Sequence, residues 1–268
     1  MKKVGISLSG GGVKALIYTG VLQALEDNNI TIDVVAGLSG GGLVASLYAS
    51  GYSGRQILEI AKDTNFFELI KPATLISGEL LDTKILKSIL KQYIKAETFE
   101  QLNKKLIILC SDIDKKEKVA ITSGDLLSAV IASCALPPII NPINRDGKRL
   151  VDGGFSTTYG TGELKKMGAR YVIGVSIQNW IDVNLLPRII RNLIEALGVA
   201  WQTIAQDEQR LNPADFILTN FEDSTGMLDF AVNKELLYKK GYDKTVANIQ
   251  AIKDGLNKKT SILDFIFQ

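Results

Sequence analysis

The chain has 268 residues, which is long enough to bury one sizeable hydrophobic core. Hydrophobic residues make up 46% of it and its net charge is only +2, a balance typical of a folded globular protein and unlike that of a dedicated nucleic-acid binder. It contains no histidine, which excludes a Ser-His-Asp triad, a Cys-His pair and a histidine-ligated metal. A nucleophilic serine in this chain would therefore need another group to accept its proton.

A short apolar strand is expected over residues 4–8, and it leads directly into the run Ser9-Gly10-Gly11-Gly12-Val13-Lys14. Helical spacing then predicts a helix over residues 15–27. A strand, a glycine loop and a helix N-terminus together present backbone N–H groups that suit an anion. The P-loop pattern is absent, and no acidic residue stands where a dinucleotide-binding unit needs one. An oxyanion hole and a plain tight turn remain as alternatives.

The second unit contains the run Gly37-Leu38-Ser39-Gly40-Gly41, which matches the G-x-S-x-G pattern of a nucleophile elbow. We expect a strand over residues 31–35 before it and a helix over residues 43–50 after it. Such a turn exposes the serine at the carboxyl edge of a parallel sheet and aims the Gly40 amide at negative charge that develops beside Ser39. Because a chain with 24 glycines contains such patterns by chance, a plain Gly-Ser turn is the alternative.

The middle of the chain alternates between helical and strand-like segments. We expect helices over residues 53–62, 82–93 and 125–134, and strands over residues 106–110 and 119–122. The apolar segment 66–77 suits core packing, with a lid or an acyl-entry surface as the alternative.

Two pairs of residues in this region have weak ligand or redox character. Asp112 and Asp114 lack further metal-ligand spacing, so we expect a solvated loop and no metal. Cys110 and Cys134 lie in apolar segments and are expected to be reduced core residues. The apolar run 4–8 is too short for a signal peptide and no run is long enough for a transmembrane helix, so the sequence predicts a soluble, cytoplasmic chain.

Asp152 stands at the end of a strand predicted over residues 149–151 and precedes Gly153-Gly154. An acidic residue at a strand end suits an active-site carboxylate, and a capping or turn aspartate is the alternative. Beyond it we expect a helix over 163–167 and strands over 171–177 and 216–219. The apolar tail 262–267 is expected to dock on the body, with a membrane or partner contact as the alternative.

This alternation of strands and helices predicts an α/β fold, a three-layer α/β/α sandwich with a mostly parallel central sheet. We expect residues 1–268 to form a single domain, with C-terminal helices over 184–211 and 232–256 packed on it. Functional groups gather at the carboxyl edges of parallel strands. One crevice can therefore hold the glycine loop, Ser39 and Asp152.

These motifs, in this order, resemble the patatin-like phospholipases, a family of lipid acyl hydrolases. The run 9–14 resembles the family's oxyanion loop, the run 37–41 its nucleophile elbow, and Asp152-Gly153-Gly154 its D-G-G/A motif. The resemblance covers residues 1–180 and includes the runs 123–126 and 132–137. Ala15, Leu38 and the run 155–159 depart from the family pattern, and these departures bear on substrate preference more than on the chemistry.

The resemblance implies a Ser-Asp dyad without histidine, which agrees with the composition. Ser39 is then the nucleophile and Asp152 activates it, while Gly10, Gly11 and Gly12 supply oxyanion donors together with Gly40. Lys14 takes the basic, substrate-binding position after the loop. No metal and no organic cofactor are implied.

We therefore expect a serine lipid acyl hydrolase of the phospholipase A or esterase type, which cleaves fatty-acyl esters through an acyl-enzyme on Ser39. An acyltransferase with the same acyl-enzyme, and a non-catalytic lipid- or protein-binding module of the same fold, are the alternatives. The implied partners are a phospholipid or other fatty-acyl ester and the surface of a membrane or micelle, not nucleic acid. Burial is expected to raise the pKa of Asp152 above the reference value of about 3.9. Because the chain has no histidine, the activity is not expected to show the change near pH 6.5 that a histidine base would cause.

Overall fold

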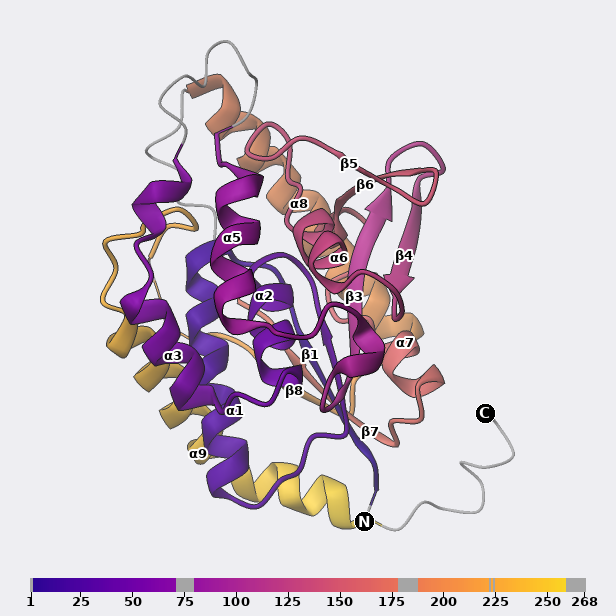
Figure 1. The fold of residues 1–268 in the computed structure, drawn as a ribbon. Helices are drawn as coiled ribbons and strands as arrows, with labels where there is room; N and C mark the ends of the chain where they lie inside the picture. The colour runs from indigo at the N-terminus through magenta and orange to yellow at the C-terminus, as the bar shows by residue number, and fades with distance from the viewer. Residues whose placement is uncertain (1, 71–79, 178–187, 222, 224, 259–268) are drawn as a thin grey trace.

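A computed structural model describes residues 2–70, 80–177, 188–221, 223 and 225–258, and Figure 1 shows its helices packed around a central sheet. The strands in these residues form one sheet in the order β5-β6-β3-β2-β1-β7-β8, with β4 also paired to β3. Their bounds are β1 Val4–Leu8, β2 Val34–Gly37, β3 Lys105–Asp112, β4 Glu117–Ile121, β5 Ile143–Arg145, β6 Lys148–Asp152, β7 Tyr171–Val175 and β8 Phe216–Leu218. Strands β3, β2, β1, β7 and β8 are parallel, whereas β4, β5 and β6 pair antiparallel. The predicted, mostly parallel sheet is confirmed.

The α-helices of the described residues are α1 Ile17–Asp27, α2 Ser39–Ala49, α3 Gly54–Asp63, α5 Thr83–Tyr93, α6 Leu126–Ser133, α7 Thr161–Lys166, α8 Arg188–Leu211 and α9 Lys234–Asn257. Short 3₁₀ helices cover Gly12–Leu16, Phe66–Leu69, Phe99–Gln101 and Gly153–Phe155. No helix within the described ranges has the length and hydropathy needed to cross a bilayer. The segments 71–79 and 178–187 and the apolar tail 262–267 lie outside the described residues.

Alternate side chains of the sheet enter two separate hydrophobic layers, as the pleat requires. On one face, Ile6, Val35 and Ile108 pack with the helices α1, α2, α3, α5, α6 and α9. On the other face, Val34, Ile107 and Val172 pack with Leu164 of α7. Consecutive residues of these strands are apolar, because the side chains on both faces of the sheet are covered. The three-layer arrangement is confirmed.

The boundaries around Ser39 differ from those expected. Strand β2 starts at Val34, since residues 34–37 pair with β1 on one side and β3 on the other. Helix α2 starts at Ser39 itself, four residues earlier than expected, so the turn between strand and helix is sharper than the apolar pattern suggested. The predicted helix over 15–27 begins as a 3₁₀ turn and becomes α-helical only at Ile17.

Two strands share one edge of β3. Strand β2 pairs with residues 105–108 of β3, and β6 pairs antiparallel with residues 110–112. Strand β4 pairs with residues 108–112 and so occupies the opposite edge. Strand β6 therefore continues along the edge that β2 leaves at Gly37. The two strands approach from opposite ends, which brings the residues after Gly37 close to Asp152.

Helix α9 packs against α1 almost backbone to backbone, on the left of Figure 1. A Cβ atom at Gly20 would lie 1.9 Å from the carbonyl oxygen of Tyr238, and one at Gly241 would lie 1.9 Å from that of Ile17. Both glycines are therefore needed for the close approach of the two helices. At the far end, Lys2 Nζ donates to the Gly255 carbonyl at 3.2 Å, so the start of the described chain lies beside the end of α9.

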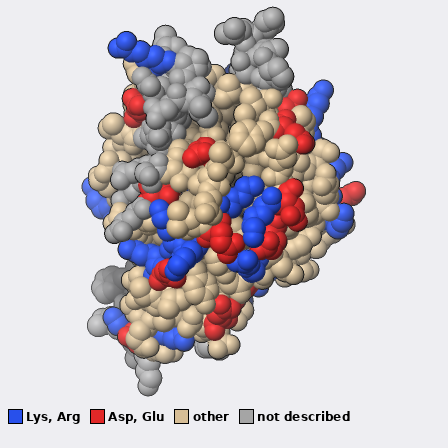
Figure 2. All heavy atoms as spheres, turned by 90° about the vertical axis from the view of Figure 1, so that its left-hand side faces the viewer, with Lys and Arg blue, Asp and Glu red and all other residues tan. Residues whose placement is uncertain are grey.

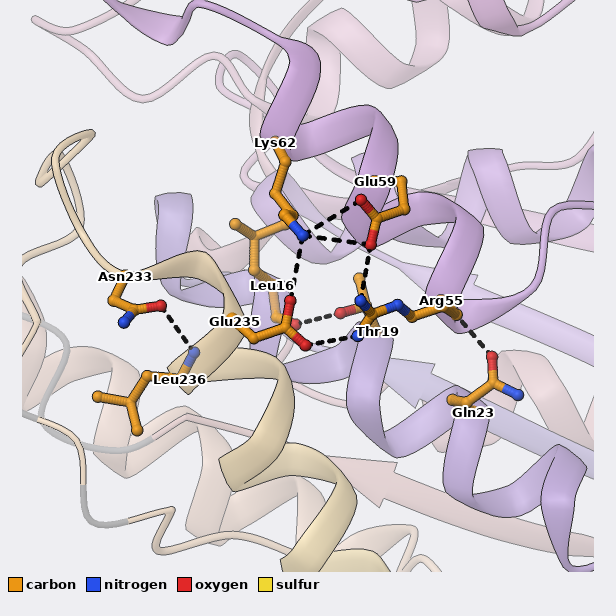
Figure 3. Close-up of polar contacts among 9 residues, drawn as sticks. All are labelled: Leu16, Thr19, Gln23, Arg55, Glu59, Lys62, Asn233, Glu235 and Leu236. Carbon is orange, nitrogen blue, oxygen red and sulfur yellow. Dashed lines mark hydrogen bonds and ion pairs between the residues drawn. The ribbon is translucent and has the colours of Figure 1, made fainter.

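Exposed ion pairs join α9 to α3 at the same side of the molecule. Figure 3 shows the Arg55 and Lys62 side chains of α3 directed at Glu235 of α9 and at Glu59. Figure 2 shows Lys/Arg and Asp/Glu side chains interleaved on this face. Because these groups are solvent-exposed, the ion pairs add little stability compared with the glycine crossing.

The crossing of α1 and α9 can be tested by adding side-chain atoms to it. We expect Gly241→Val to lower the free energy of unfolding by about 3 kcal/mol or more, because the added atoms overlap the Ile17 carbonyl. Gly162→Ala in α7 is the matched control, since its Cβ would meet Asn212 at an ordinary 3.7 Å. Urea denaturation of the two variants measures the difference. A Gly241→Val protein as stable as the wild type would contradict this packing.

Candidate active site

Ser39 occupies a strained position at the junction of β2 and α2. Its φ is +52°, in the left-handed region that side-chain-bearing residues rarely adopt. The Ser39 amide donates to the Ser133 hydroxyl of α6 at 3.1 Å, which holds the turn from the side. Close packing supports the strain, because a Cβ at Gly40 would lie 2.4 Å from the Gly12 carbonyl oxygen. The backbone thus presents the Ser39 side chain at the carboxyl edge of the sheet, as the elbow pattern predicts.

Asp152 ends β6 on the other side of this junction. Its backbone is held twice, since its amide donates to the Ala135 carbonyl at 2.9 Å and its carbonyl accepts from Ser111 Oγ at 3.0 Å. Its carboxylate accepts the Gly154 amide at 2.8 Å. Burial raises the pKa of Asp152 to about 6, against the opposing hydrogen bonds from the Gly154 amide and the Ser39 hydroxyl. The pKa of Asp152 is raised, as expected. Because a pKa of about 6 lies close to that of histidine, the acid side of the pH–rate profile is no longer expected to differ clearly from that of an enzyme with a histidine base.

The glycine-rich loop runs directly past Ser39. A Cβ at Gly10 would lie 3.9 Å from Ser39 Oγ. Among the residues that the structure describes, the amides of Gly10 and Gly11 have no hydrogen-bond acceptor. The Gly40 amide lies in the first turn of α2, whose N-cap residue Leu38 provides no side-chain acceptor. These amides are available to an anion beside Ser39.

Two cavities meet at Ser39. The first, which we call the apolar cavity, has a volume of about 170 Å³ and is lined almost wholly by hydrocarbon side chains of α2, α3, α5 and the segments 136–140 and 227–230. The second, which we call the polar cavity, has a volume of about 320 Å³ and is lined by Gly10, Gly11, Ser39, Asp152, several hydroxyl side chains and one face of α8. Gly12 and Gly40 line the apolar cavity instead. Phe66 and Leu69 also line it, so the described part of segment 66–77 borders this cavity.

Lys14 lies apart from the other expected site residues. Its side chain is fully buried and forms an ion pair with Asp223 at 3.7 Å, and neither cavity is lined by it. Asp223 also pairs with Lys240 of α9 at 2.9 Å. The glycine loop is thereby tied to the C-terminal part of the chain, where the Met227 carbonyl also accepts the Val13 amide at 3.0 Å.

Several residues that support the site escaped sequence reasoning. Glu208 of α8 accepts hydrogen bonds from the Thr157 hydroxyl and from the amides of Thr158 and Tyr159, which orders the loop after Asp152. No local signal marks it, because its partners lie 49–51 residues away.

Asp112 is buried and caps the following turn, so the expected solvated loop is wrong for this residue. Within the described ranges, no group of three or more acidic or cysteine side chains is placed to hold a metal ion.

The two cysteines are free thiols. Cys110 is buried in β3, and Cys134 is only partly buried and lines the apolar cavity. Burial raises the pKa of both thiols, so neither is a ready nucleophile. Ser39, the nucleophile expected from the sequence, lines both cavities.

Comparison with known proteins identifies relatives of this chain. A family model described as patatin-like phospholipase matches residues 6–165. A lysophospholipase NTE1 of Scheffersomyces stipitis is 31% identical over 184 residues, which are 65% of this chain and 12% of that protein. A patatin-like phospholipase domain-containing protein of Caenorhabditis elegans is 27% identical over 224 residues, 78% of this chain and 15% of that protein. The chain thus spans a small part of the length of these curated relatives.

Solved structures with little sequence similarity share the fold. VipD from Legionella pneumophila superposes with a TM-score of 0.61 at 16% identity, covering 95% of this chain and 67% of that one. Human GIVD cytosolic phospholipase A2 gives a TM-score of 0.54 at 13% identity, covering 95% of this chain and 59% of the other. At such low identity these likenesses establish the architecture alone.

The buried state of Asp152 can be measured through stability. A carboxyl whose pKa rises from 3.8 to about 6 on folding destabilises the native state above pH 6, and this loss disappears as pH falls toward 4. We expect Asp152→Asn to be stabilised relative to the wild type by up to about 3 kcal/mol more at pH 8 than at pH 4. Denaturant titrations at both pH values measure this, with the exposed Asp146→Asn as control. A difference independent of pH would contradict a buried, ionisable Asp152.

Proposed function

Because this chain belongs to the patatin-like phospholipase family, a family of hydrolases, we propose that it is a serine lipid acyl hydrolase that acts through a Ser39–Asp152 dyad. The observation that carries the proposal is the position of Ser39, which lies where an apolar and a polar cavity meet and lines the polar cavity together with the buried carboxylate of Asp152. An ester has the same division, with a hydrocarbon acyl chain on one side of its carbonyl and a polar alcohol on the other. The relatives named lysophospholipases support a phospholipid or other fatty-acyl ester as substrate.

The first half-reaction forms an acyl-enzyme. Ser39 Oγ attacks the ester carbonyl while Asp152 accepts its proton, and the amides of Gly10, Gly11 and Gly40 are placed to stabilise the resulting oxyanion. Asp152 then returns the proton to the leaving alcohol as the carbonyl–oxygen bond breaks. A pKa of about 6 suits both roles near neutral pH, because the group is ionised before the attack and still able to carry a proton.

The second half-reaction releases the fatty acid. Water enters from the polar cavity once the alcohol has left, Asp152 removes its proton, and the hydroxide attacks the acyl carbonyl. The proton passes back to Ser39 as the ester bond to the enzyme breaks. Gly12, the remaining expected oxyanion donor, lines the apolar cavity as Gly40 does, so it stays a candidate donor beside the first acyl carbons.

The dyad is tested by paired substitutions. Ser39→Ala and Asp152→Asn should each lower kcat for p-nitrophenyl esters by about 10³-fold or more, and the double variant should be no worse, because the two residues act as a unit. Ser128→Ala on α6 and Asp146→Asn are the matched controls outside both cavities. Wild-type kcat/KM should fall about tenfold per pH unit below about pH 6.

The outcomes separate the proposal from its alternatives. A fluorophosphonate should label the wild type and leave Ser39→Ala unlabelled. A folded wild type that is not labelled and cleaves no ester would support a non-catalytic binding module. Transfer of the acyl group to an added alcohol in preference to water would support an acyltransferase. Full activity of folded Asp152→Asn would remove Asp152 from the mechanism.

The apolar cavity predicts how acyl length is limited. Leu43 and Leu47 follow Ser39 at four-residue intervals on the cavity-facing side of α2, so Leu47 lies about 12 Å from Ser39 along the helix axis. We expect Leu43→Trp to lower kcat/KM for dodecanoyl esters at least about tenfold relative to butanoyl esters, because it fills the first turn of the path. Leu43→Ala should leave or raise the dodecanoyl rate. Equal chain-length profiles for wild type and Leu43→Trp would contradict this path.

A further inference from the structure

The described lining of the polar cavity carries acidic but no basic side chains. Among the described residues that border it there is no lysine and no arginine. Two carboxylates do line the cavity, Asp152 at the dyad and Glu195 on α8. The described side chains that line this cavity therefore carry a net negative charge whenever Asp152 is ionised.

Lys14, the cation expected beside the glycine loop from the sequence, does not line the polar cavity. Lys14 is 0% exposed, and its ion pair with Asp223 neutralises its charge inside the protein. Lys240 approaches Asp223 from α9, so this buried carboxylate is shared by two lysines. Burial alone would raise the pKa of Asp223, but hydrogen bonds from Lys240 and Thr225 and the charge of Lys14 together lower it and keep it ionised. None of these three charged side chains lines the polar cavity.

The wall opposite the dyad is one face of α8. Glu195, Val199 and Gln202 recur at intervals of four and three residues and border the cavity together with Trp201. Hydroxyl side chains of Thr157, Thr158 and Ser176 complete the lining. Such a surface offers hydrogen bonds and an aromatic ring, but its described residues provide no cationic side chain to pair with a phosphate.

We propose that the polar cavity selects esters whose alcohol portion carries no net negative charge, and that it discriminates against anionic head groups. The proposal rests on the proposed function, because it assigns the leaving alcohol to this cavity. An anionic head group would lose its hydration to face Glu195 and Asp152 with no compensating cation among the lining residues that the structure describes, whereas a neutral polyol or a zwitterion would not. Selectivity here comes from repulsion of the wrong substrate.

The test compares lipids that share one acyl chain. Monoacylglycerol, lysophosphatidylcholine and lysophosphatidic acid with the same acyl group are presented in the same neutral detergent micelle, so that the surface charge does not vary. We expect kcat/KM for lysophosphatidic acid to be at least about tenfold lower than for the other two, with a smaller gap at high salt. Hydrolysis of lysophosphatidic acid at a rate equal to or above that of monoacylglycerol would overturn the proposal.

Charge substitutions test whether the polar cavity is the source of the discrimination against anionic head groups. Glu195→Lys should narrow the gap between anionic and neutral lipids about tenfold, and Glu195→Gln should narrow it about threefold. Glu117→Lys on the exposed strand β4 makes the same change in net charge outside the cavity and should leave the ratio unchanged. An equal effect of both lysine variants, or no effect of Glu195→Lys, would assign the discrimination elsewhere. Hydrolysis of p-nitrophenyl butyrate, which has no head group, separately tests the proposed function.

Discussion

The shared edge of β3 is the constraint on which the site depends. Strands β2 and β6 meet along it from opposite ends, so their ordinary backbone pairing places Ser39 and Asp152 together. The fit leaves no room at the meeting point, because a Cβ at Gly153 would lie 2.4 Å from the Leu109 carbonyl and 3.0 Å from the Leu38 Cβ. The same closeness removes water from the Asp152 carboxylate and raises its pKa. The protein thus carries a destabilising ionised group in the place where the proposed mechanism requires a base.

Motifs that depend on local backbone geometry could be predicted from the sequence. The glycine loop, the elbow around Ser39 and the strand-end Asp152 each follow from a short run of residues, and the alternation of elements predicts the layers. Partnerships between distant residues could not be predicted, because no short-range pattern encodes them. Ser133 lies 94 residues from the amide that it accepts, and the burial of Lys14 depends on Asp223 from a segment after the last strand. The antiparallel strand β5 escaped notice because its three residues are too few to show a period.

The region after residue 165, beyond the family match, contributes much of the substrate environment. Met227 lines both cavities and its carbonyl accepts an amide of the glycine loop, while α8 forms a wall of the polar cavity. Glu208 of α8 orders the loop after Asp152, and α9 covers the helix that follows the glycine loop. The proposed dyad and much of the surroundings of the two cavities therefore come from different parts of the chain. Relatives can keep the residues around Ser39 and Asp152 and vary the residues that surround the two cavities.

The contact between Lys2 and the carbonyl of Gly255 has a consequence for how this fold is joined to other polypeptide. Strand β1 runs from this contact toward the glycine loop, so the contact lies at the amino end of the strand and the catalytic groups lie at its carboxyl end. The two ends of the described chain therefore lie on the side of the sheet away from the cavities. The fold is thus suited to serve as a module within a larger architecture, and a circular permutant that links these neighbouring ends would keep its crevice open.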